Sequence, residues 1–587
     1  MSESQKRRLH VVSTVGLACL AAACFLAACG ESDGGGDDTS KAGGGNAGSA
    51  GAPVSNGGSS ASAGQAGDEN IGEGGEAGSE TGGTGGSTAG TAGIGGSTAG
   101  KGGSGATSGS AGTGGAPVVL TPNCVRDTTS GKTIAISADG NDGLSGVTHA
   151  ADGSLYATGF VQDGVADTED RATVVVKIKA DGTLDTDWAA SGIARHNVRV
   201  MATGVAGQGE LPRGIAFQGD KIIVAGTVDA YTTTQTEVVY NNDRDVYVLR
   251  LNADGTLDGT FGDAATPGIR ILSLGTGVKT LNANNMDTIS GADAQWGLNV
   301  LQGNSIIVTS ATRSPGAELV AGTPRTDTDF AVVKLTPNGA LDTTFGLNES
   351  GVYTLDVASA SASVRSASVL PDGKLIVTGY STFNGTQRPV IFKLLENGSA
   401  LDQSFGLFGV FSDPVGLAGE AYGALLQTDN KLVTVGYGRA TAANATSDFL
   451  SIRLTPGGLL DTSYGATMAT PTTPATPGRT WFDVGGLADN GRALLLSDNR
   501  PVLLGSGALS SGQVDGVVVL LAANGKPGST GFGPPYGCTA YDFGSVGDSF
   551  AGGDVLSDGK IAVVGSTSHG NGSPTDTDAT FVLIPKP

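Results

Sequence analysis

A short apolar segment recurs seven times along the chain, and each copy has the pattern of a β-strand. The copies are rich in Val, Ile and Leu, and turn residues such as Asp152-Gly153 and Asp372-Gly373 precede most of them. Apolar runs bounded by turn residues are typical of strands. The copies are Ser154–Phe160, Lys221–Thr227, Ser305–Ala311, Lys374–Tyr380, Lys431–Tyr437, Arg500–Ser506 and Lys560–Ser566.

A glycine occupies the sixth position in six of the seven copies. Glycine at one fixed place in a strand indicates a β-bulge or a close approach of another backbone. We therefore expect a tight contact at this position in most repeats. The glycines are Gly159, Gly226, Gly379, Gly436, Gly505 and Gly565.

Three further strands are predicted in each copy. A second strand follows the apolar segment, for example Asp245–Leu251, and in the first five copies a tight turn then leads into an Asp. An aromatic-Gly pair and a third short strand often come next, and a fourth strand lies just before each apolar segment. This fourth strand carries a small residue, with Arg492 as the exception: Gly146, Gly214, Gly297, Ser366, Gly423 and Gly552.

Four short strands in each of seven copies are typical of a β-propeller. The small residues suit the crowded inner wall of a ring, and the aromatic residues suit wedges between blades. The last copy ends after its third strand, whereas Val125–Gly131 and the strand after it resemble the missing part. We therefore expect an all-β fold at residues 117–587, a seven-bladed propeller closed by an N-terminal strand, which leaves no open sheet edge.

The first 28 residues have the pattern of an export signal. Basic residues at positions 6–8 precede an apolar stretch from Val11 to Leu26, which is shorter than a membrane span. The stretch ends in Leu26-Ala27-Ala28-Cys29, which resembles the bacterial lipoprotein signal and implies lipidation of Cys29. An ordinary secretory signal that happens to contain Cys stays open as the alternative.

Residues 29–116 are predicted to be a disordered tether. They consist almost entirely of Gly, Ser, Ala and Thr and contain no aromatic residue. Such a segment cannot bury enough apolar surface to offset the loss of chain entropy on folding. We expect it to hold the folded domain away from the membrane.

The net charge and the cysteines indicate which partners and which cellular compartment suit this protein. The formal net charge of −22 argues against binding to nucleic acid. Two of the five cysteines, Cys124 and Cys538, lie outside the signal region. In a closed ring their strands are in neighbouring blades, and an exported compartment permits a disulfide between them; two isolated thiols are the alternative.

The repeat unit resembles the delta-60 repeat, a tandem repeat of exported bacterial proteins. The shared pattern is DGKI-hydrophobic-V-x-G, then DF-x-hydrophobic-x-R/K-L, then DG-x-LD-x-x-FG, and it covers nearly all of residues 118–587. The last two copies depart from it, because Leu520 and Leu583 replace the basic residue of the second strand. The resemblance implies the fold and export, and it implies no activity.

Aspartate and arginine are the candidate functional residues. Asp recurs at the start of the second strand and at the end of the hairpin, where it suits Ca²⁺ or hydrogen bonds to the turn backbone; the second interpretation is favoured because the residue recurs in most units. Arg213, Arg365 and Arg492 fall on predicted inner strands. If they face the channel, its mouth is locally basic and accepts an anionic group; hydrogen bonding to neighbouring strands is the alternative.

The sequence therefore predicts a lipoprotein of the bacterial cell envelope, at the outer membrane or cell surface. Its monomeric propeller is expected to be a binding or structural module for a polysaccharide, a peptide or an envelope partner. The alternative is a propeller-type hydrolase or lyase acting on extracellular glycans. No catalytic residue is identified, and Ca²⁺ is the one cofactor that the pattern suggests.

Overall fold

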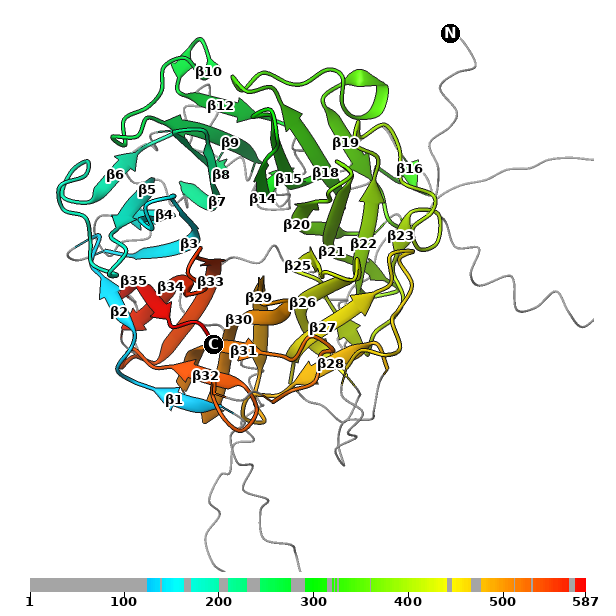
Figure 1. Cartoon of the computed structure of the whole chain (residues 1–587). Coiled ribbons are helices and arrows are strands. Elements are labelled where there is room, and N and C mark those ends of the chain that lie inside the picture. Colours follow the sequence, from blue (N-terminus) through cyan, green and yellow to red (C-terminus); the bar gives the residue numbers. More distant parts are fainter. Residues whose placement is uncertain are drawn as a thin grey trace, which may run out of the picture. The chain divides into compact units, whose positions relative to one another are not determined.

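A computed structural model gives the fold of the chain (Figure 1). It describes residues 124–137, 140–162, 170–199, 209–229, 243–275, 291–313, 319–320, 323–324, 327–358, 360–440, 446–465, 477–510, 513–528, 531–569 and 576–587. No helix within these ranges has the length and apolar character needed to cross a bilayer. The expected signal peptide with Cys29, and the expected tether, lie outside the described residues.

The main strands of each sequence repeat pair antiparallel, and we call each such set a sheet and number it by its repeat. Sheets 6 and 7 are parts of one nine-stranded sheet, joined by a parallel bridge between Val514 and Gly547. Sheet 1 contains β3 (Asp142–His149), β4 (Leu155–Gln162), β5 (Arg171–Ile178) and β6 (Ile193–His196). Sheet 2 contains β7 (Glu210–Gln218), β8 (Lys221–Asp229), β9 (Asp243–Leu251) and β12 (Ile269–Leu272), with the short strand β13 (Gly291–Ala292) beside β9. Sheet 3 contains β14 (Ala294–Val300), β15 (Ile306–Arg313), β18 (Thr328–Leu335) and β19 (Val352–Leu355).

The later repeats follow the same order. Sheet 4 contains β20 (Ala362–Val369), β21 (Leu375–Phe383), β22 (Thr386–Leu394) and β23 (Val410–Phe411). Sheet 5 contains β24 (Ala418–Gly419), β25 (Gly423–Leu426), β26 (Leu432–Arg439), β27 (Asp448–Leu454) and β28 (Arg479–Phe482). Sheet 6 contains β29 (Asp489–Ser497), β30 (Arg500–Ser510), β31 (Gln513–Leu520) and β32 (Cys538–Tyr541). Sheet 7 contains β33 (Gly547–Val555), β34 (Ile561–His569), β35 (Asp576–Ile584) and β2 (Lys132–Ile134).

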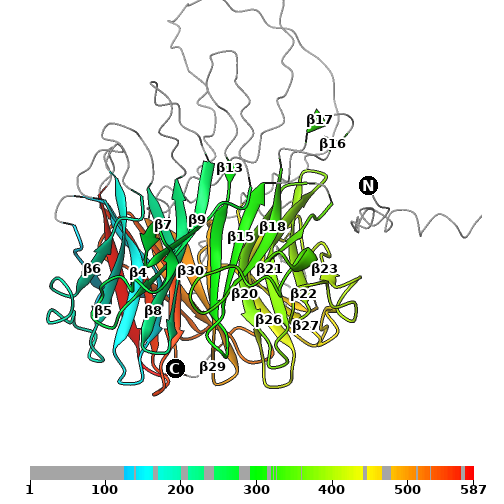
Figure 2. The ribbon, with the colours of Figure 1, turned by 90° about the horizontal axis from the view of Figure 1, so that it is seen from above.

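The sheets follow one another around a central axis, which is the arrangement of a β-propeller (Figures 1 and 2). The first strand of each repeat lies nearest the centre, and the apolar segment found in the sequence forms the second strand of each sheet. Minor elements lie in the connections: the hairpin β10 (Gly262–Asp263) with β11 (Thr266–Pro267), the hairpin β16 (Leu319–Val320) with β17 (Thr323–Pro324), and the 3-10 helix η2 (Leu347–Glu349).

The N-terminal segment contributes to two sheets. β2 pairs antiparallel with β35, and β1 (Val125–Asp127) pairs in parallel with β32 of sheet 6. Cys124 and Cys538 form a disulfide with a Cα–Cα distance of 4.5 Å, and the Arg126 guanidinium lies 2.8 Å from the buried Asp515 carboxylate. The sequence suggested only the strand in the last repeat, and the addition of β1 to sheet 6 was not foreseen.

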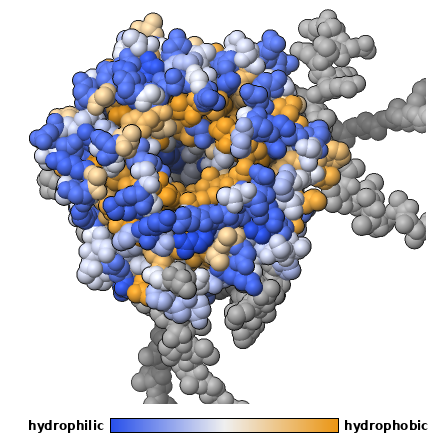
Figure 3. All heavy atoms as spheres, in the orientation of Figure 1, coloured by the Kyte–Doolittle hydropathy of each residue, from blue (hydrophilic) through white to orange (hydrophobic). Residues whose placement is uncertain are grey.

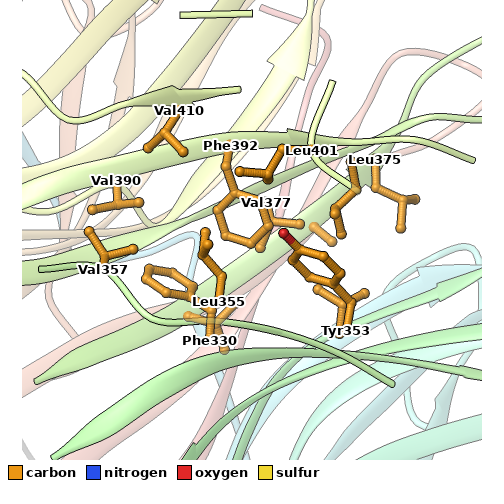
Figure 4. Close-up of a cluster of buried hydrophobic side chains, with 14 of the residues drawn as sticks. Phe330, Tyr353, Leu355, Val357, Leu375, Val377, Val390, Phe392, Leu401 and Val410 are labelled. Atoms are coloured by element: carbon orange, nitrogen blue, oxygen red, sulfur yellow. The ribbon is translucent and has the colours of Figure 1, made fainter. Parts of the chain in front are cut away.

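Apolar side chains from neighbouring sheets fill the space between them. Between sheets 3 and 4, Phe330 and Phe392 meet edge to face with ring centroids 5.3 Å apart, and Tyr353 packs beside them (Figure 4). These side chains are almost completely removed from water. Burial of a large apolar side chain stabilises the fold by about 1.5–3 kcal/mol, so each interface between sheets contributes to holding the ring together.

The aromatic residues after the hairpins pack against the next sheet, as the sequence pattern predicts. A Cβ placed on Gly398 would lie 2.4 Å from the ring of Phe345, and one on Gly525 would lie 2.4 Å from Tyr464. Both glycines have positive φ, so the hairpin needs glycine for its backbone conformation and for the ring stacked on it. In the first repeat, Trp188 has this role against Gly255.

The recurring Asp of the hairpin forms an ion pair with the basic residue of the strand that follows the apolar segment. Arg453 Nε lies 2.8 Å from Asp461, and Asp461 also accepts hydrogen bonds from the backbone and hydroxyl of Ser463. The other pairs join Lys177 to Asp185, Arg250 to Asp258, Lys334 to Asp342, and Lys393 to Asp402. The sixth repeat has lost both partners together, since Leu520 replaces the base and no Asp follows its Asn524-Gly525 turn.

Removing the disulfide should destabilise the ring at its N-terminal seam. We expect Cys538→Ser to lower the free energy of unfolding by about 2–5 kcal/mol, because the crosslink restricts the unfolded chain. Chemical denaturation of the oxidised proteins measures the difference. The wild type in reductant is the control and should match the variant; equal stability of oxidised wild type and variant would contradict the prediction.

Candidate functional site

A bulge interrupts the innermost strand of most sheets near its beginning. The pairing register shifts by one residue between Pro212 and Gly214 in β7, and between Val364 and Ser366 in β20. The sixth-position glycine of the next strand lies opposite: a Cβ on Gly379 would lie 2.1 Å from the Ser363 carbonyl oxygen. This agrees with the bulge and close backbone approach that the sequence predicts.

The bulge presents one side chain per sheet at the centre of the ring. By register, the small residue that follows it in sheet 6 is Ala493, which pairs with Leu504. Arg492 is therefore not an exception among the small residues, as the sequence suggested, but belongs to the bulge position itself. Tyr422 takes this place in sheet 5, directly before Gly423. In order of sheets, the position holds Ser145, Arg213, Trp296, Arg365, Tyr422, Arg492 and Ala551.

The bulge residues of sheets 2 to 6 alternate between arginine and an aromatic residue, and we call them the arginine–aromatic arc. The guanidinium carbons of Arg213 and Arg365 lie 3.9 and 4.2 Å from the Trp296 ring centroid. Those of Arg365 and Arg492 lie 4.5 and 5.1 Å from the Tyr422 ring centroid. Each distance is within the range of cation–π attraction. The Trp296 and Tyr422 rings also meet edge to face with centroids 5.8 Å apart, so five successive sheets supply one connected group of side chains.

Hydrogen bonds fix the orientation of each arginine. Arg365 is buried and donates from Nε and Nη2 to the Glu420 carboxylate at 3.1 and 2.9 Å. Arg492 donates to the Tyr422 hydroxyl at 2.7 Å, and Arg213 donates to the carbonyl of Gln295 at 2.8 Å. Because each guanidinium is held by stacking and by at least one hydrogen bond, the arc is preorganised before any ligand arrives.

The arc carries more positive than negative charge. It holds three guanidinium groups, and Arg365 engages the carboxylate of Glu420. Burial and then the positive charge of Arg365 lower the pKa of Arg213 to about 9, with Arg492 adding to the effect. Arg213 stays protonated at neutral pH, but its charged form is disfavoured by these surroundings. An anion beside it would relieve that cost, in a chain whose formal net charge is −22.

The two sheets outside the arc have small side chains at the same position. Sheet 1 has the half-buried Ser145, and sheet 7 has Ala551, which is exposed. The space-filling view shows the molecule hollowed at the centre of the ring (Figure 3). Solvent therefore reaches the inner wall where the arc is interrupted.

Carboxylates gather where the sheets meet, and these are the residues able to hold a metal ion. Asp327, Asp329 and Asp356 each offer an oxygen within 4.8 Å of the others, and oxygen donors of this kind suit Ca²⁺. The same holds for Asp448 with Asp483 and Asp489, and for Asp515 with Asp542 and Asp548. In the last group the Arg126 guanidinium provides an internal cation, 2.8 Å from Asp515 and 3.8 Å from Asp542. Calcium binding stays a prediction.

Carboxylates three residues before the bulge hold the connections between sheets. Glu210 Oε1 accepts hydrogen bonds from the backbone N–H groups of Val198 and Arg199, both at 2.8 Å, while Oε2 is buried without a partner among the described residues. Burial raises the pKa of Glu210 to about 8. Each of these carboxylates accepts a hydrogen bond from a backbone N–H group of the connection before its strand. They are Asp142, Glu210, Asp293, Asp489 and Asp548.

The structure brings the three sequence-predicted arginines into one site and places Cys124 with Cys538 in one disulfide. Sequence reasoning missed Trp296, Tyr422 and Glu420. A signal for the two aromatic residues was present, because each directly precedes the small residue of its inner strand, as Arg213 does. Glu420 lies on a separate turn and had no such signal.

Comparisons with known proteins support the propeller-type repeat. Residues 218–261, 319–345 and 370–405 match the family described as "Domain of unknown function (DUF5122) beta-propeller". No curated protein matches the chain.

Several solved structures match the backbone of this chain with low similarity. Polysaccharide lyase Uly1 has a TM-score of 0.39 at 12% identity, covering 78% of this chain and 92% of its own. A PL25 ulvan lyase bound to -[GlcA(1-4)Rha3S]- has a TM-score of 0.39 at 9% identity. The match covers 78% of this chain and 96% of the lyase. A neuraminidase-like protein from A/bat/Guatemala/164/2009 has a TM-score of 0.32 at 11% identity. The match covers 63% of this chain and 87% of that protein. These scores lie below 0.5, and no activity of this chain follows from them.

The buried carboxyl of Glu210 should make stability fall as pH rises. Since the folded pKa is about 8 and the unfolded value is about 4.3, the folded state binds more protons between these values. Its contribution is therefore lost as pH rises through this window, by at most about 1.4 kcal/mol per pH unit. Urea denaturation from pH 5 to 8 should give a shallower decline for Glu210→Gln than for wild type.

The exposed Glu396 provides a matched control. Glu396→Gln should follow the wild-type profile, because that side chain is not buried. A Glu210→Gln profile as steep as that of the wild type would contradict the prediction.

Proposed function

We propose that residues 117–587 form a seven-bladed β-propeller, closed by the N-terminal strands, that binds an acidic polysaccharide at the arginine–aromatic arc. The observation that carries the proposal is the convergence of Arg213, Arg365 and Arg492 around Trp296 and Tyr422. The antiparallel set of strands in each of the seven sequence repeats supports the blade number, and the pairing of β2 with β35 supports the closure.

An acidic ligand fits the charge of the arc. Arginine presents a planar fork of donors that matches carboxylate and sulfate groups. Arg365 in the middle of the arc pairs with the Glu420 carboxylate. Arg213 has no carboxylate partner within the part of the chain that the structure describes. A ligand carboxylate would supply the missing negative charge.

A polysaccharide is the extracellular ligand class that best suits this position. The site faces the central channel of a ring, which admits a narrow chain end more readily than a folded partner. We favour binding over catalysis because the arc is built of stacked arginines and aromatic rings and its Glu420 carboxylate is engaged by Arg365. A lyase or hydrolase that acts on the same polysaccharide is the alternative, and the binding experiment distinguishes the two by product release.

The proposed location is the bacterial cell envelope. The lipoprotein-like signal ending at Cys29 supports a lipid anchor, and the Gly/Ser/Ala/Thr-rich segment after it supports a tether. Two or more acyl chains would hold the protein firmly at a membrane.

Binding should require both the ligand carboxylates and Arg213. We expect the purified protein to bind polygalacturonate and not its fully methyl-esterified form, which keeps the backbone and loses the charge. Because a charge-assisted hydrogen bond contributes about 1.5–3 kcal/mol, Arg213→Gln should weaken binding about tenfold or more. Isothermal titration calorimetry measures both effects.

Arg195, exposed on β6 at the outer edge of sheet 1, is the matched control. Arg195→Gln should bind as the wild type does. Equal affinity for the charged and esterified polymers would contradict the proposal, and steady release of unsaturated or reducing ends would favour the enzyme.

The anchor depends on Cys29. Cys29→Ala should abolish incorporation of radiolabelled palmitate and release the protein from membranes, because the acylated thiol is removed. Cys24→Ala is the control and should keep the label. Undiminished labelling of the Cys29 variant would contradict the assignment of Cys29 as the lipidated residue.

A further inference from the structure

The arginine–aromatic arc is open at one place, between its two ends. Sheets 2 to 6 fill the bulge position with large side chains, whereas sheets 7 and 1 have Ala551 and Ser145. Because sheet 7 lies between sheets 6 and 1, the opening is bordered by Arg492 on one side and Arg213 on the other. We call this place the arc gap.

The backbone is continuous behind the arc gap. A Cβ on Gly552 would lie 2.7 Å from the Ser145 carbonyl oxygen, and a Cβ on Gly146 would lie 3.0 Å from the Arg213 carbonyl oxygen. The inner strands of sheets 7, 1 and 2 therefore touch. The gap is missing side-chain volume on an intact wall, and the exposure of Ala551 shows that this volume reaches solvent.

The arginines at the two ends of the arc, Arg213 and Arg492, border the arc gap. The faces of Trp296 and Tyr422 already receive guanidinium groups, so a ligand meets the arc most readily at its ends. Arg213 donates to the Gln295 carbonyl through Nη1. Arg492 is close enough that its positive charge contributes to the lowered pKa of Arg213.

We propose that the arc gap is the subsite for one carboxylate-bearing sugar residue, whose carboxylate lies between Arg213 and Arg492 and against Ser145 and Ala551. This inference rests on the proposed function and deepens it. A carboxylate is small enough to enter where two small side chains replace two large ones, and it can accept hydrogen bonds from both guanidinium groups. The Ser145 hydroxyl donates to the Pro212 carbonyl, which fixes its position at the edge of the gap.

Filling the gap without touching the arginines tests the proposal. The probe is trigalacturonate, with its methyl ester as the uncharged counterpart. Ala551→Phe should weaken trigalacturonate binding at least tenfold, because the ring occupies the volume that the sugar needs. Ala340→Phe, at an exposed position of an outer hairpin, is the matched control and should bind as the wild type does.

A second substitution keeps the test valid if the phenylalanine variant folds poorly. Ala551→Asp places a carboxylate in the gap, so it should abolish binding of trigalacturonate and raise the melting temperature by relieving the repulsion between Arg213 and Arg492. Calorimetry and thermal denaturation measure the two effects.

The outcomes separate the two proposals. If the wild type binds trigalacturonate and Arg213→Gln does not, while both Ala551 variants bind normally, the arc is the site and the gap is not. If the wild type binds neither the polymer nor the trimer, both proposals are overturned. Loss of binding in both Ala551 variants, with Ala340→Phe unchanged, supports the gap.

Discussion

The contact between a bulged inner strand and the glycine opposite it determines what the centre of this ring contains. In sheet 4 the carbonyl of Ser363 occupies the space that a Cβ on Gly379 would need. The bulge bends the strand and re-aims one residue, so each sheet presents a single side chain at an equivalent place. Glycine leaves room for the bulged backbone in most sheets, although sheet 3 has Ser310 at this place, and the bulge residue differs between repeats. This division allows a regular scaffold to carry an irregular centre.

The arginine–aromatic arc uses that freedom in five successive sheets. Arg365 stacks on Trp296 and Tyr422 and engages the buried Glu420, so the middle of the arc is internally compensated. Arg213 at one end lacks such a carboxylate among the described residues. A buried ion pair of this kind costs desolvation energy and contributes little net stability. Its value here is that it holds the aromatic rings in place for the end arginines.

The outer parts of the sheets are built from contacts that repeat. The basic residue of the strand after the apolar segment forms an ion pair with the Asp of the hairpin in five repeats. The sixth repeat has neither residue. Either group alone would leave an uncompensated charge at this place. There the N-terminal strands, the disulfide and the Arg126–Asp515 pair provide other contacts.

The sequence by itself determined the repeat, its strands, the glycine contact and the Asp-rich turns, because these depend on neighbours along the chain and recur in several copies. It also placed Arg213, Arg365 and Arg492 on inner strands. Only the tertiary structure decided that Arg492 occupies the bulge position, because a shift of one residue in register is invisible in sequence. Only the ring brings Glu420 and Trp296 from different sheets to Arg365, since contacts between sheets depend on how the whole chain closes.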